Sequence, residues 1–435
     1  MKPVLIRGGR VVDPANQVDG LFDVLLQDGR VQQVAAPGAI RATGTRVIDA
    51  RGMVVAPGFV DIHVHLRQPG QEYKETIATG TATAVAGGFT SVCCMPNTVP
   101  VNDSPEITRW MRAPERGAVV NVFPIAAATV GSLGEKLTDY SKLKSAGAVA
   151  VTDDGKPILG DAIMEQALRA AAKLGLPVIQ HAEDTRLTGG CSMNLGPTSF
   201  RLGLRGMPVE AESGIVERDI ALARKTGAHL HVAHISTRKA LAAVRKAKKD
   251  GVRVTCEVTP HHFTLLDEHV GDYNTNYKMN PPLRGDDDRA AMIRGLLDGT
   301  IDAIATDHAP HALHEKEQEF DRAPMGITGL ETALPLALQV LHRAHKLPLP
   351  RLIALLSTNP ARLLSLKGKG HLGRGAHADV VIFDPDAKWT FYAADSRSKS
   401  KNTPFDGWQF TGRVLTAVVS GQIVFTAKDA KVAKG

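Results

Sequence analysis

The stretch VAPGFVDIHVH, from Val55 to His65, is an apolar run that ends abruptly in polar side chains. Seven further runs have the same form, and segments with helical periodicity, such as AIMEQALRAAAKLG (162–175) and AAMIRGLLDG (290–299), lie between them. The seven are FTSVCCMPN (89–97), VVNVFPIA (119–126), AVAVTDDG (148–155), LPVIQHAED (176–184), HLHVAHIS (229–236), RVTCEVTPHH (253–262) and DAIATDHAPH (302–311). Continuous apolar runs that alternate with helices indicate parallel strands covered by helices. The sequence therefore predicts an α/β fold with a (β/α)8 TIM-like barrel, in which chemistry takes place at the C-terminal strand ends.

The two ends of the chain have a different pattern. Residues 1–55 and 365–435 contain short alternating stretches broken by Gly, Asp and Pro, which are typical of small antiparallel strands. Examples are VLIRGGRVVDP (4–14), DVLLQDGRVQQVA (23–35), HADVVIFDP (377–385) and LTAVVSGQIVF (415–425). We expect these ends to pair into one composite β-sandwich domain, with a catalytic barrel of residues 56–364 inserted between them.

The composition excludes several classes of protein. The net charge is +7 and the pI is near 9.2, but the basic residues are scattered among acidic ones, so no nucleic-acid partner is expected. No signal peptide and no run of about 18 apolar residues is present, so we expect a cytoplasmic protein that does not contact membranes. The four cysteines form no CxxC pair, which argues against a disulfide framework or a zinc ribbon.

Polar side chains at the predicted strand ends suggest a metal site. His63 and His65 are two residues apart on one strand and therefore point to the same side. Alone, such a pair is equally compatible with a hydrogen-bonded polar edge. Four more groups stand at other strand ends, namely Asp153, His181, His234 and Asp307. A closed barrel would bring all six together, and uncompensated buried carboxylates would be costly, so a divalent metal is predicted, with zinc first and manganese or cobalt as substitutes.

The order of these motifs resembles a known family. PGFVDIHVHLRQPG, MPNT, TDDG, HAED, AHIS, EVTPHH, NPPLR and TDHAPH are similar, in that order, to the bacterial type I dihydroorotases of the amidohydrolase superfamily. The resemblance extends through the C-terminal NTPFDGWQFTGRVLTAVVSGQIV. One departure is Gln68, where the family usually has an acidic residue, and we expect it to affect only local hydrogen bonding.

The resemblance implies two zinc ions. It assigns His63, His65 and Asp307 to one metal and His181 and His234 to the second, with Asp153 bridging them. In the related hydantoinases and allantoinases a carboxylated lysine forms this bridge, and Lys156 lies too far beyond the fourth strand to be an obvious equivalent. An aspartate bridge would therefore separate this chain from those relatives.

The resemblance also implies the reaction, which is the reversible hydrolysis of the cyclic amide of dihydroorotate to N-carbamoyl-L-aspartate in pyrimidine synthesis. A hydroxide shared by the metals would attack the ring carbonyl, and Asp307 would carry its proton to the leaving ring nitrogen. Arg67, Asn97 and His311 would bind the substrate carboxylate, since a planar guanidinium suits a bidentate contact. Asn280 would hydrogen-bond to the amide edge of the ring. We expect structural roles for His261 and His262, because the metal positions are already filled.

Two other readings remain open. The first is a different cyclic amidase, a hydantoinase (dihydropyrimidinase) or an allantoinase, which Asp153, Arg67 and Asn97 disfavour. The second is a catalytically silent partner of aspartate transcarbamoylase, which would be missing metal ligands, whereas none is missing here. The resemblance also makes a complex with aspartate transcarbamoylase and a homo-oligomer plausible.

Overall fold

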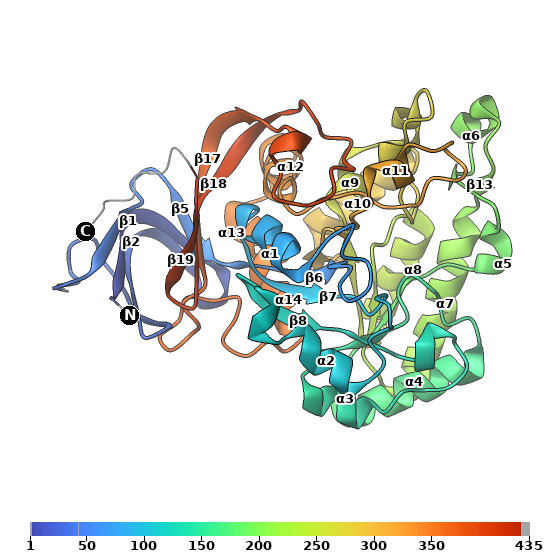
Figure 1. Cartoon of the computed structure of the whole chain (residues 1–435), viewed down its shortest axis with the longest axis horizontal. Helices are drawn as coiled ribbons and strands as arrows, with labels where there is room; N and C mark the ends of the chain where they lie inside the picture. Colours follow the sequence, from blue (N-terminus) through green and yellow to red (C-terminus); the bar gives the residue numbers. More distant parts are fainter. Residues whose placement is uncertain (1, 42, 428–435) are drawn as a thin grey trace.

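The computed structural model describes residues 2–41 and 43–427, and its central element is a parallel barrel (Figure 1). Each of the eight predicted runs contains a strand, and the third is divided into β8 and β9. The strands are β6 (Phe59–Val64), β7 (Phe89–Cys94), β8 (Asn121–Pro124), β9 (Ala126–Ala127), β10 (Val151–Thr152), β11 (Val178–Gln180), β14 (Leu230–Val232), β15 (Val254–Val258) and β16 (Ala303–Ile304). They pair as β6-β7-β8 and as β9-β10-β11-β14-β15-β16, in parallel throughout.

The first and last barrel strands close on each other. Val64 forms a parallel bridge with His308, and the backbone N–H of His65 donates to the His308 carbonyl at 2.9 Å. The buried Asp61 carboxylate accepts hydrogen bonds from the backbone N–H groups of His63 at 3.0 Å and Thr306 at 3.2 Å. These contacts hold the ends of β6 and β16 together and place His63, His65 and Asp307 on the same rim.

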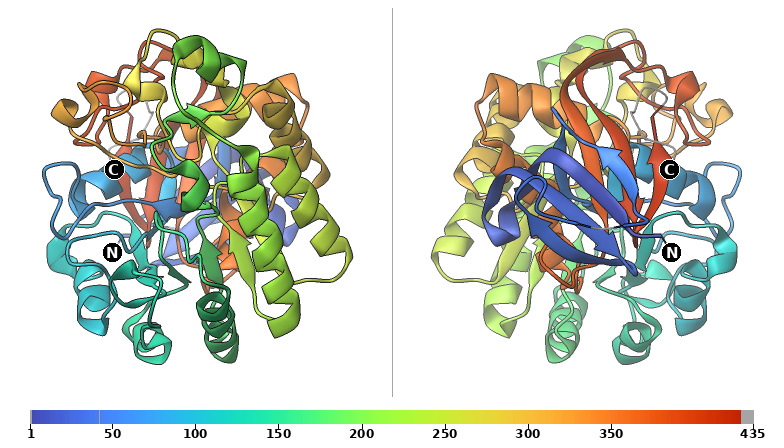
Figure 2. Two further views of the ribbon diagram at one scale, coloured as in Figure 1. Left: turned by 90° about the vertical axis from the view of Figure 1, so that its right-hand side faces the viewer. Right: turned by 90° about the vertical axis from the view of Figure 1, so that its left-hand side faces the viewer.

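Helices follow the strands and form the outer layer of the barrel (Figure 2). The longest are α1 (Ile77–Ala86), α4 (Asp161–Leu174), α7 (Val209–Thr226), α8 (Arg238–Lys249) and α10 (Asp286–Asp298). Shorter ones are α2 (Pro105–Met111), α3 (Tyr140–Ala146), α9 (Pro260–Thr264), α11 (Leu313–Lys316), α12 (Ala333–Ala337), α13 (Leu349–Ile353) and α14 (Asn359–Leu363). Alternate strand residues such as Val151, Val178 and Cys256 belong to the apolar core shared with these helices, together with Met164 and Leu168 of α4. Their neighbours along each strand therefore point toward the barrel axis.

Both ends of the chain contribute to a second sheet. Its strands are β1 (Val4–Asp13), β2 (Val18–Gln27), β3 (Arg30–Ala35), β4 (Arg46–Asp49), β5 (Val54–Pro57), β17 (Val380–Thr390), β18 (Gln409–Val419) and β19 (Gln422–Thr426). The two ends meet where β5 pairs with β17 antiparallel, and blue and red strands lie side by side in Figure 2. An apolar core that includes Val11, Val24, Val55 and Ile382 packs within this unit. The expected composite β-domain is therefore confirmed, while its exact boundaries, residues 55 and 365, remain a prediction.

An excursion leaves the barrel after β11. It consists of α5 (Thr185–Thr188), β12 (Met193–Asn194), α6 (Pro197–Leu202) and β13 (Gly206–Met207), with β12 and β13 paired in parallel. The buried Arg284 donates to the Asn194 side chain at 3.0 Å and to the Met207 carbonyl at 3.3 Å. This guanidinium therefore ties the excursion to the loop that follows α9 and carries Asn280.

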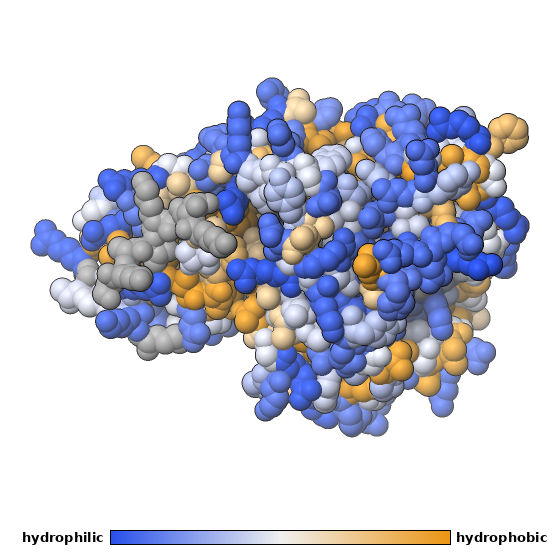
Figure 3. Space-filling model, turned by 45° about the horizontal axis from the view of Figure 1, so that its top comes forward, coloured by the Kyte–Doolittle hydropathy of each residue, from blue (hydrophilic) through white to orange (hydrophobic). Residues whose placement is uncertain are grey.

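Hydrophilic side chains cover most of the face drawn in Figure 3, and apolar ones are scattered between them. Within residues 2–41 and 43–427, no helix combines the length and the apolar character needed to cross a bilayer.

Candidate active site

Four histidines and two aspartates converge at the C-terminal end of the barrel. Within the described residues, three overlapping groups have ligand atoms no more than 4.8 Å apart. They are His63, His65 and Asp154; His63, His234 and Asp307; and Asp154, His181 and His234. The cluster therefore contains five of the six side chains predicted from the sequence, and Asp154 is the sixth member.

Asp154 occupies the centre of this cluster. Its Oδ1 lies 3.5 Å from His181 Nδ1, 3.6 Å from His63 Nε2 and 3.7 Å from His234 Nε2. Its Oδ2 lies 3.6 Å from His65 Nε2. One carboxylate thus faces all four imidazoles, as a ligand shared by the whole cluster would.

The expectation that Asp153 would face the other ligands is corrected by the structure. Its carboxylate accepts hydrogen bonds from the Thr129 backbone N–H at 2.9 Å and from the Thr129 hydroxyl. Val151 packs against the helical layer, and Asp153, two residues later, lies on the same side of the chain. Asp154 therefore points to the barrel axis. Lys156 is exposed, so it is not positioned to supply a bridging carbamate.

The donor set fits a divalent cation. His63 Nε2 and Asp154 Oδ1 are buried and have no hydrogen-bond partner, although both face the cluster. Asp154 Oδ1 lies 3.5–3.7 Å from the imidazole nitrogens of three histidines. Two ligand atoms of a tetrahedral metal with bonds near 2.1 Å are about 3.4 Å apart, so these distances are close to that value. Imidazole and carboxylate donors together suit zinc and its neighbours in the transition series. The residues present therefore fit a metal centre.

The charges in the cluster shift the pKa values of its side chains. Burial would raise the pKa of Asp154, but the nearby histidines, His63 foremost, lower it well below its ordinary value. Burial lowers the pKa of His63, but Asp154 and Asp307 outweigh this effect and raise it well above 6.5. The metal-free cluster therefore retains protons that a bound cation would displace.

A cavity of about 210 Å³ opens beside the cluster, and all four predicted substrate-binding residues line it: Arg67, Asn97, Asn280 and His311. Arg67 is buried, and its Nε–H donates to the Pro310 carbonyl at 3.1 Å, which fixes the guanidinium plane. Burial lowers the pKa of His311 to about 2, so this ring is neutral. The cavity thus presents one fixed cation beside the ligand cluster.

The two asparagines also contact ligand side chains. Asn97 Oδ1 lies 2.8 Å from His65 Nδ1, so the amide carbonyl can accept the ring proton and leave Nε2 for a metal. Asn280 Nδ2 lies 3.3 Å from His181 Nε2, and it donates to Glu183 Oε2 at 2.7 Å. Each asparagine therefore both lines the cavity and contacts one imidazole of the cluster.

Two carboxylates of the site were not predicted from the sequence. Glu183 Oε2 lies 2.9 Å from His181 Nε2, and Glu257 Oε1 lies 2.7 Å from His63 Nδ1. Both stand inside the motifs HAED and EVTPHH. Glu257 could have been found as a charged residue within an otherwise apolar strand, since such a group requires a buried partner.

His262 holds the loop that carries Asn280. Its Nε2 lies 3.0 Å from the Pro281 carbonyl and its Nδ1 lies 2.7 Å from Thr259 Oγ1, as expected for a structural histidine. His261 is also buried. Burial lowers the pKa of His262 to about 3, so the folded protein keeps this ring neutral in mildly acidic solution.

This neutral ring gives a testable dependence of stability on pH. His262 has a pKa near 6.5 in the unfolded chain, so between about pH 6.5 and 3 only the unfolded chain binds this proton. The contribution of His262 to the free energy of unfolding therefore falls by up to about 1.4 kcal/mol for each pH unit in that range. We expect the stability difference between the parent and His262→Gln to shrink as the pH falls from 7 to 5. Urea unfolding of both proteins at the two pH values measures it. A constant difference would contradict the assignment.

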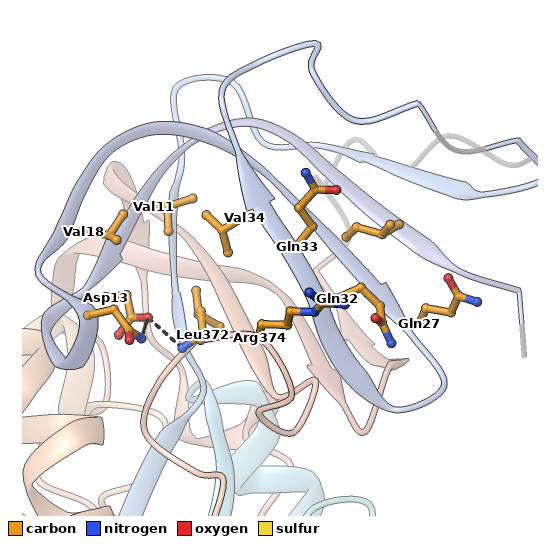
Figure 4. Close-up of a pocket in the computed structure, with 12 residues that line it drawn as sticks. Val11, Asp13, Val18, Gln27, Gln32, Gln33, Val34, Leu372 and Arg374 are labelled. Carbon is orange, nitrogen blue, oxygen red and sulfur yellow. Dashed lines mark hydrogen bonds between the residues drawn. The ribbon is translucent and has the colours of Figure 1, made fainter.

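A larger hollow, of about 670 Å³, lies in the terminal sheet, away from these ligands (Figure 4). Its lining includes Val11, Val34, Gln32 and Gln33, together with Asp13, whose Oδ2 accepts a hydrogen bond from the Leu372 backbone N–H at 2.7 Å. None of the metal-ligating groups found in the described residues lines it. Size alone therefore does not identify the active site, and the smaller cavity with the buried ligands does.

Comparison with known proteins gives the family. The chain is 49% identical over 431 residues to a dihydroorotase of Solibacter usitatus, a match that covers 99% of this chain and 100% of that protein. The chain belongs to the dihydroorotase family. A dihydroorotase of Geobacter sp. strain M21 is 51% identical over 425 residues, which cover 98% of this chain and 99% of that protein. The profile of the family described as Dihydro-orotase-like matches residues 52–240. The resemblance found in the motifs is thereby confirmed, as is the assignment to metal-dependent amide hydrolases.

Solved structures confirm the fold of this dihydroorotase family member. An L-hydantoinase (dihydropyrimidinase) from Arthrobacter aurescens superposes with a TM-score of 0.87 at 25% identity, covering 100% of this chain and 98% of that chain. A dihydropyrimidinase from Brevibacillus agri has a TM-score of 0.84 at 24% identity, covering 98% and 96% of the two chains. The barrel with its composite β-domain is thus shared with hydantoinases, whereas identity near 50% is found with dihydroorotases.

Proposed function

We propose that this enzyme catalyses the reversible hydrolysis of the cyclic amide of dihydroorotate to N-carbamoyl-L-aspartate. Membership of the family supports the reaction class. The choice of dihydroorotate as substrate rests on one observation, the buried guanidinium of Arg67 in the cavity beside the ligand cluster. A planar, permanently charged group held in one orientation favours a ligand with a carboxylate on a rigid ring.

We infer that two divalent ions, zinc in the first instance, bind in the cluster. The proposed ligands are His63, His65 and Asp307 for one ion and His181 and His234 for the other, with Asp154 in the bridging place first predicted for Asp153. When bound, such ions lower the pKa of water and polarise a carbonyl group. Asn97 and Glu183 would orient two of the imidazoles, those of His65 and His181, through their second ring nitrogens.

Asp307 is the proposed proton carrier. Burial would raise the pKa of its carboxyl, but His63, His65 and His234 lower it well below its ordinary range, so the group is anionic and can accept a proton. It lines the cavity, and its Oδ1 lies 3.0 Å from His65 Nε2. In hydrolysis Asp307 accepts the proton of the attacking water and gives it to the ring nitrogen as the C–N bond breaks. In ring closure it takes the proton from that nitrogen.

The expected effect of Arg67→Lys tests the substrate assignment. A lysine ammonium is a point charge and cannot reproduce two parallel N–H contacts, so we expect the KM for dihydroorotate to rise at least about 10-fold, or about 1.4 kcal/mol. Initial rates at several substrate concentrations measure this change, and metal content should equal that of the parent. A KM equal to that of the parent would remove Arg67 from the substrate site.

A parallel assay with dihydroorotate, hydantoin and allantoin tests the proposed function as a whole. Turnover of dihydroorotate alone is expected, whereas turnover of hydantoin or allantoin in its place would overturn the proposal. Zinc as the native metal, two ions per subunit, a homo-oligomer, a complex with aspartate transcarbamoylase and a cytoplasmic location remain predictions.

A further inference from the structure

A chain of hydrogen-bonded polar side chains runs down the barrel axis from the metal-ligand cluster. Glu257 lies on β15, where Cys256 and Val258 face the helical layer and the glutamate therefore faces the axis. Its Oε1 lies 2.7 Å from His63 Nδ1, and its Oε2 lies 3.1 Å from His231 Nε2. His63 and His231 have no exposed surface, and Glu257 is 1% exposed, so no solvent replaces these contacts.

The chain continues toward the opposite end of the barrel. Thr255 Oγ1 lies 2.9 Å from His231 Nδ1 and 2.8 Å from His229 Nε2. His229 is 8% exposed and Thr255 is partly exposed, so the chain reaches water only at the end away from the ligand cluster. Its members come from three strand regions, and the catalytic assignments above use only His63.

Once a bound cation has displaced the second proton of His63, one arrangement of protons satisfies every contact along the chain. An ionised carboxylate only accepts, so His63 Nδ1–H and His231 Nε2–H both donate to Glu257. His231 Nδ1 then accepts from the Thr255 hydroxyl, and Thr255 Oγ1 accepts from His229 Nε2–H. Burial lowers the pKa of His229 to about 3, in keeping with a neutral ring. The arrangement leaves the lone pair of His63 on Nε2, which faces Asp154 and Asp307.

We propose that Glu257 is a positioning residue for the metal centre, which fixes His63 as an Nε2 ligand and is itself held by His231 and Thr255. The inference rests on the proposed function only in taking His63 as a metal ligand. A carboxylate on the second nitrogen of a ligand imidazole orients the ring and raises its basicity. The affinity of the centre for metal therefore depends on a side chain that does not line the cavity.

Metal affinity of graded variants tests this proposal. In Glu257→Gln the amide oxygen can still accept from His63 but the charge is lost, and in Glu257→Leu the acceptor is lost as well. We expect zinc to bind about 10–100-fold more weakly in Glu257→Gln and more weakly still in Glu257→Leu. Competition with a chromogenic chelator measures the dissociation constants. The thermal midpoint of each metal-depleted protein, measured separately, reports on the fold.

Two further variants keep the test decisive. Asp23→Asn removes a carboxylate that is 2% exposed and accepts from Gly8 N and Gly38 N in the terminal sheet, so it should alter stability without altering zinc affinity. His231→Gln, which removes the second support of Glu257, should weaken zinc binding even if the Glu257 variants fail to fold. If Glu257→Gln folds, a zinc affinity within about twofold of the parent overturns the proposal. If Glu257→Gln does not fold, the same result in His231→Gln overturns it.

The dihydroorotate assay of the parent enzyme separates this inference from the proposed function. If the parent is active and the Glu257 variants bind zinc as tightly as the parent does, only the inference is contradicted. An inactive parent whose zinc affinity follows the expected order would sink the proposed function and leave the inference standing.

Discussion

Replacing Asp154 with asparagine is expected to abolish tight metal binding and to lower kcat/KM for dihydroorotate by at least about 10²–10³-fold, the loss typical of removing one preorganised electrostatic partner. Asp154 is the carboxylate that faces all four imidazoles, and an amide in its place carries no charge to balance the two proposed cations. Metal content after dialysis and turnover of the reconstituted enzyme measure both effects.

Asp153→Asn is the matched control for this prediction. That carboxylate bonds to Thr129, so its loss should reduce stability and leave most of the metal in place. Reconstitution of the parent should also be independent of bicarbonate, because the proposed bridging ligand is Asp154 and Lys156 is exposed. Loss of metal only in Asp153→Asn, or activity that requires bicarbonate, would reverse the assignment made here.

Asp307→Asn is expected to lower kcat by about 10²–10⁴-fold, the usual contribution of general acid–base catalysis, with a smaller change in the KM for dihydroorotate. The amide can still offer one oxygen to a metal, but it cannot accept a proton from water. Steady-state rates in both directions measure the change, since the proposed mechanism gives Asp307 the proton transfer in ring opening and in ring closure. Asp302→Asn is a control that should retain kcat. Asp302 lies five residues before Asp307, and its carboxylate accepts hydrogen bonds from Lys248 Nζ and from the Cys256 backbone N–H. A kcat for Asp307→Asn within tenfold of the parent would assign the proton transfer to another group.

The positions of the barrel strands could be predicted from the sequence because each strand ends at a change from apolar to polar residues. His63, His65, His181, His234 and Asp307 follow such changes, and the closed barrel brings them together. Arg67, Asn97, Asn280 and His311 followed from the resemblance, and the structure places all four along one cavity.

The choice between Asp153 and Asp154 could not be predicted in the same way. A strand buried on both faces has apolar residues at every position, so AVAVTDDG carries no alternation that shows which side faces the axis. The packing of Val151 against the helices decides it, and that contact depends on the tertiary structure. The roles of Glu183 and Glu257 were missed for a related reason, because their partners His181 and His63 are identified by side-chain direction rather than by spacing along the chain.

The pairing of β5 with β17 has a consequence for biosynthesis. Pro57 and Val380 are about 320 residues apart, so at roughly 5–20 residues per second the ribosome takes on the order of 15–60 s to deliver the partner of β5. During that interval the nascent chain presents an unpaired, apolar strand edge, which is a template for pairing with other chains. Because Asp307 is also translated long after His63, the emerging polypeptide has no complete metal centre to stabilise it. Protection of the N-terminal strands by chaperones, or slow expression at low temperature, should therefore raise the yield of active enzyme more than added zinc does.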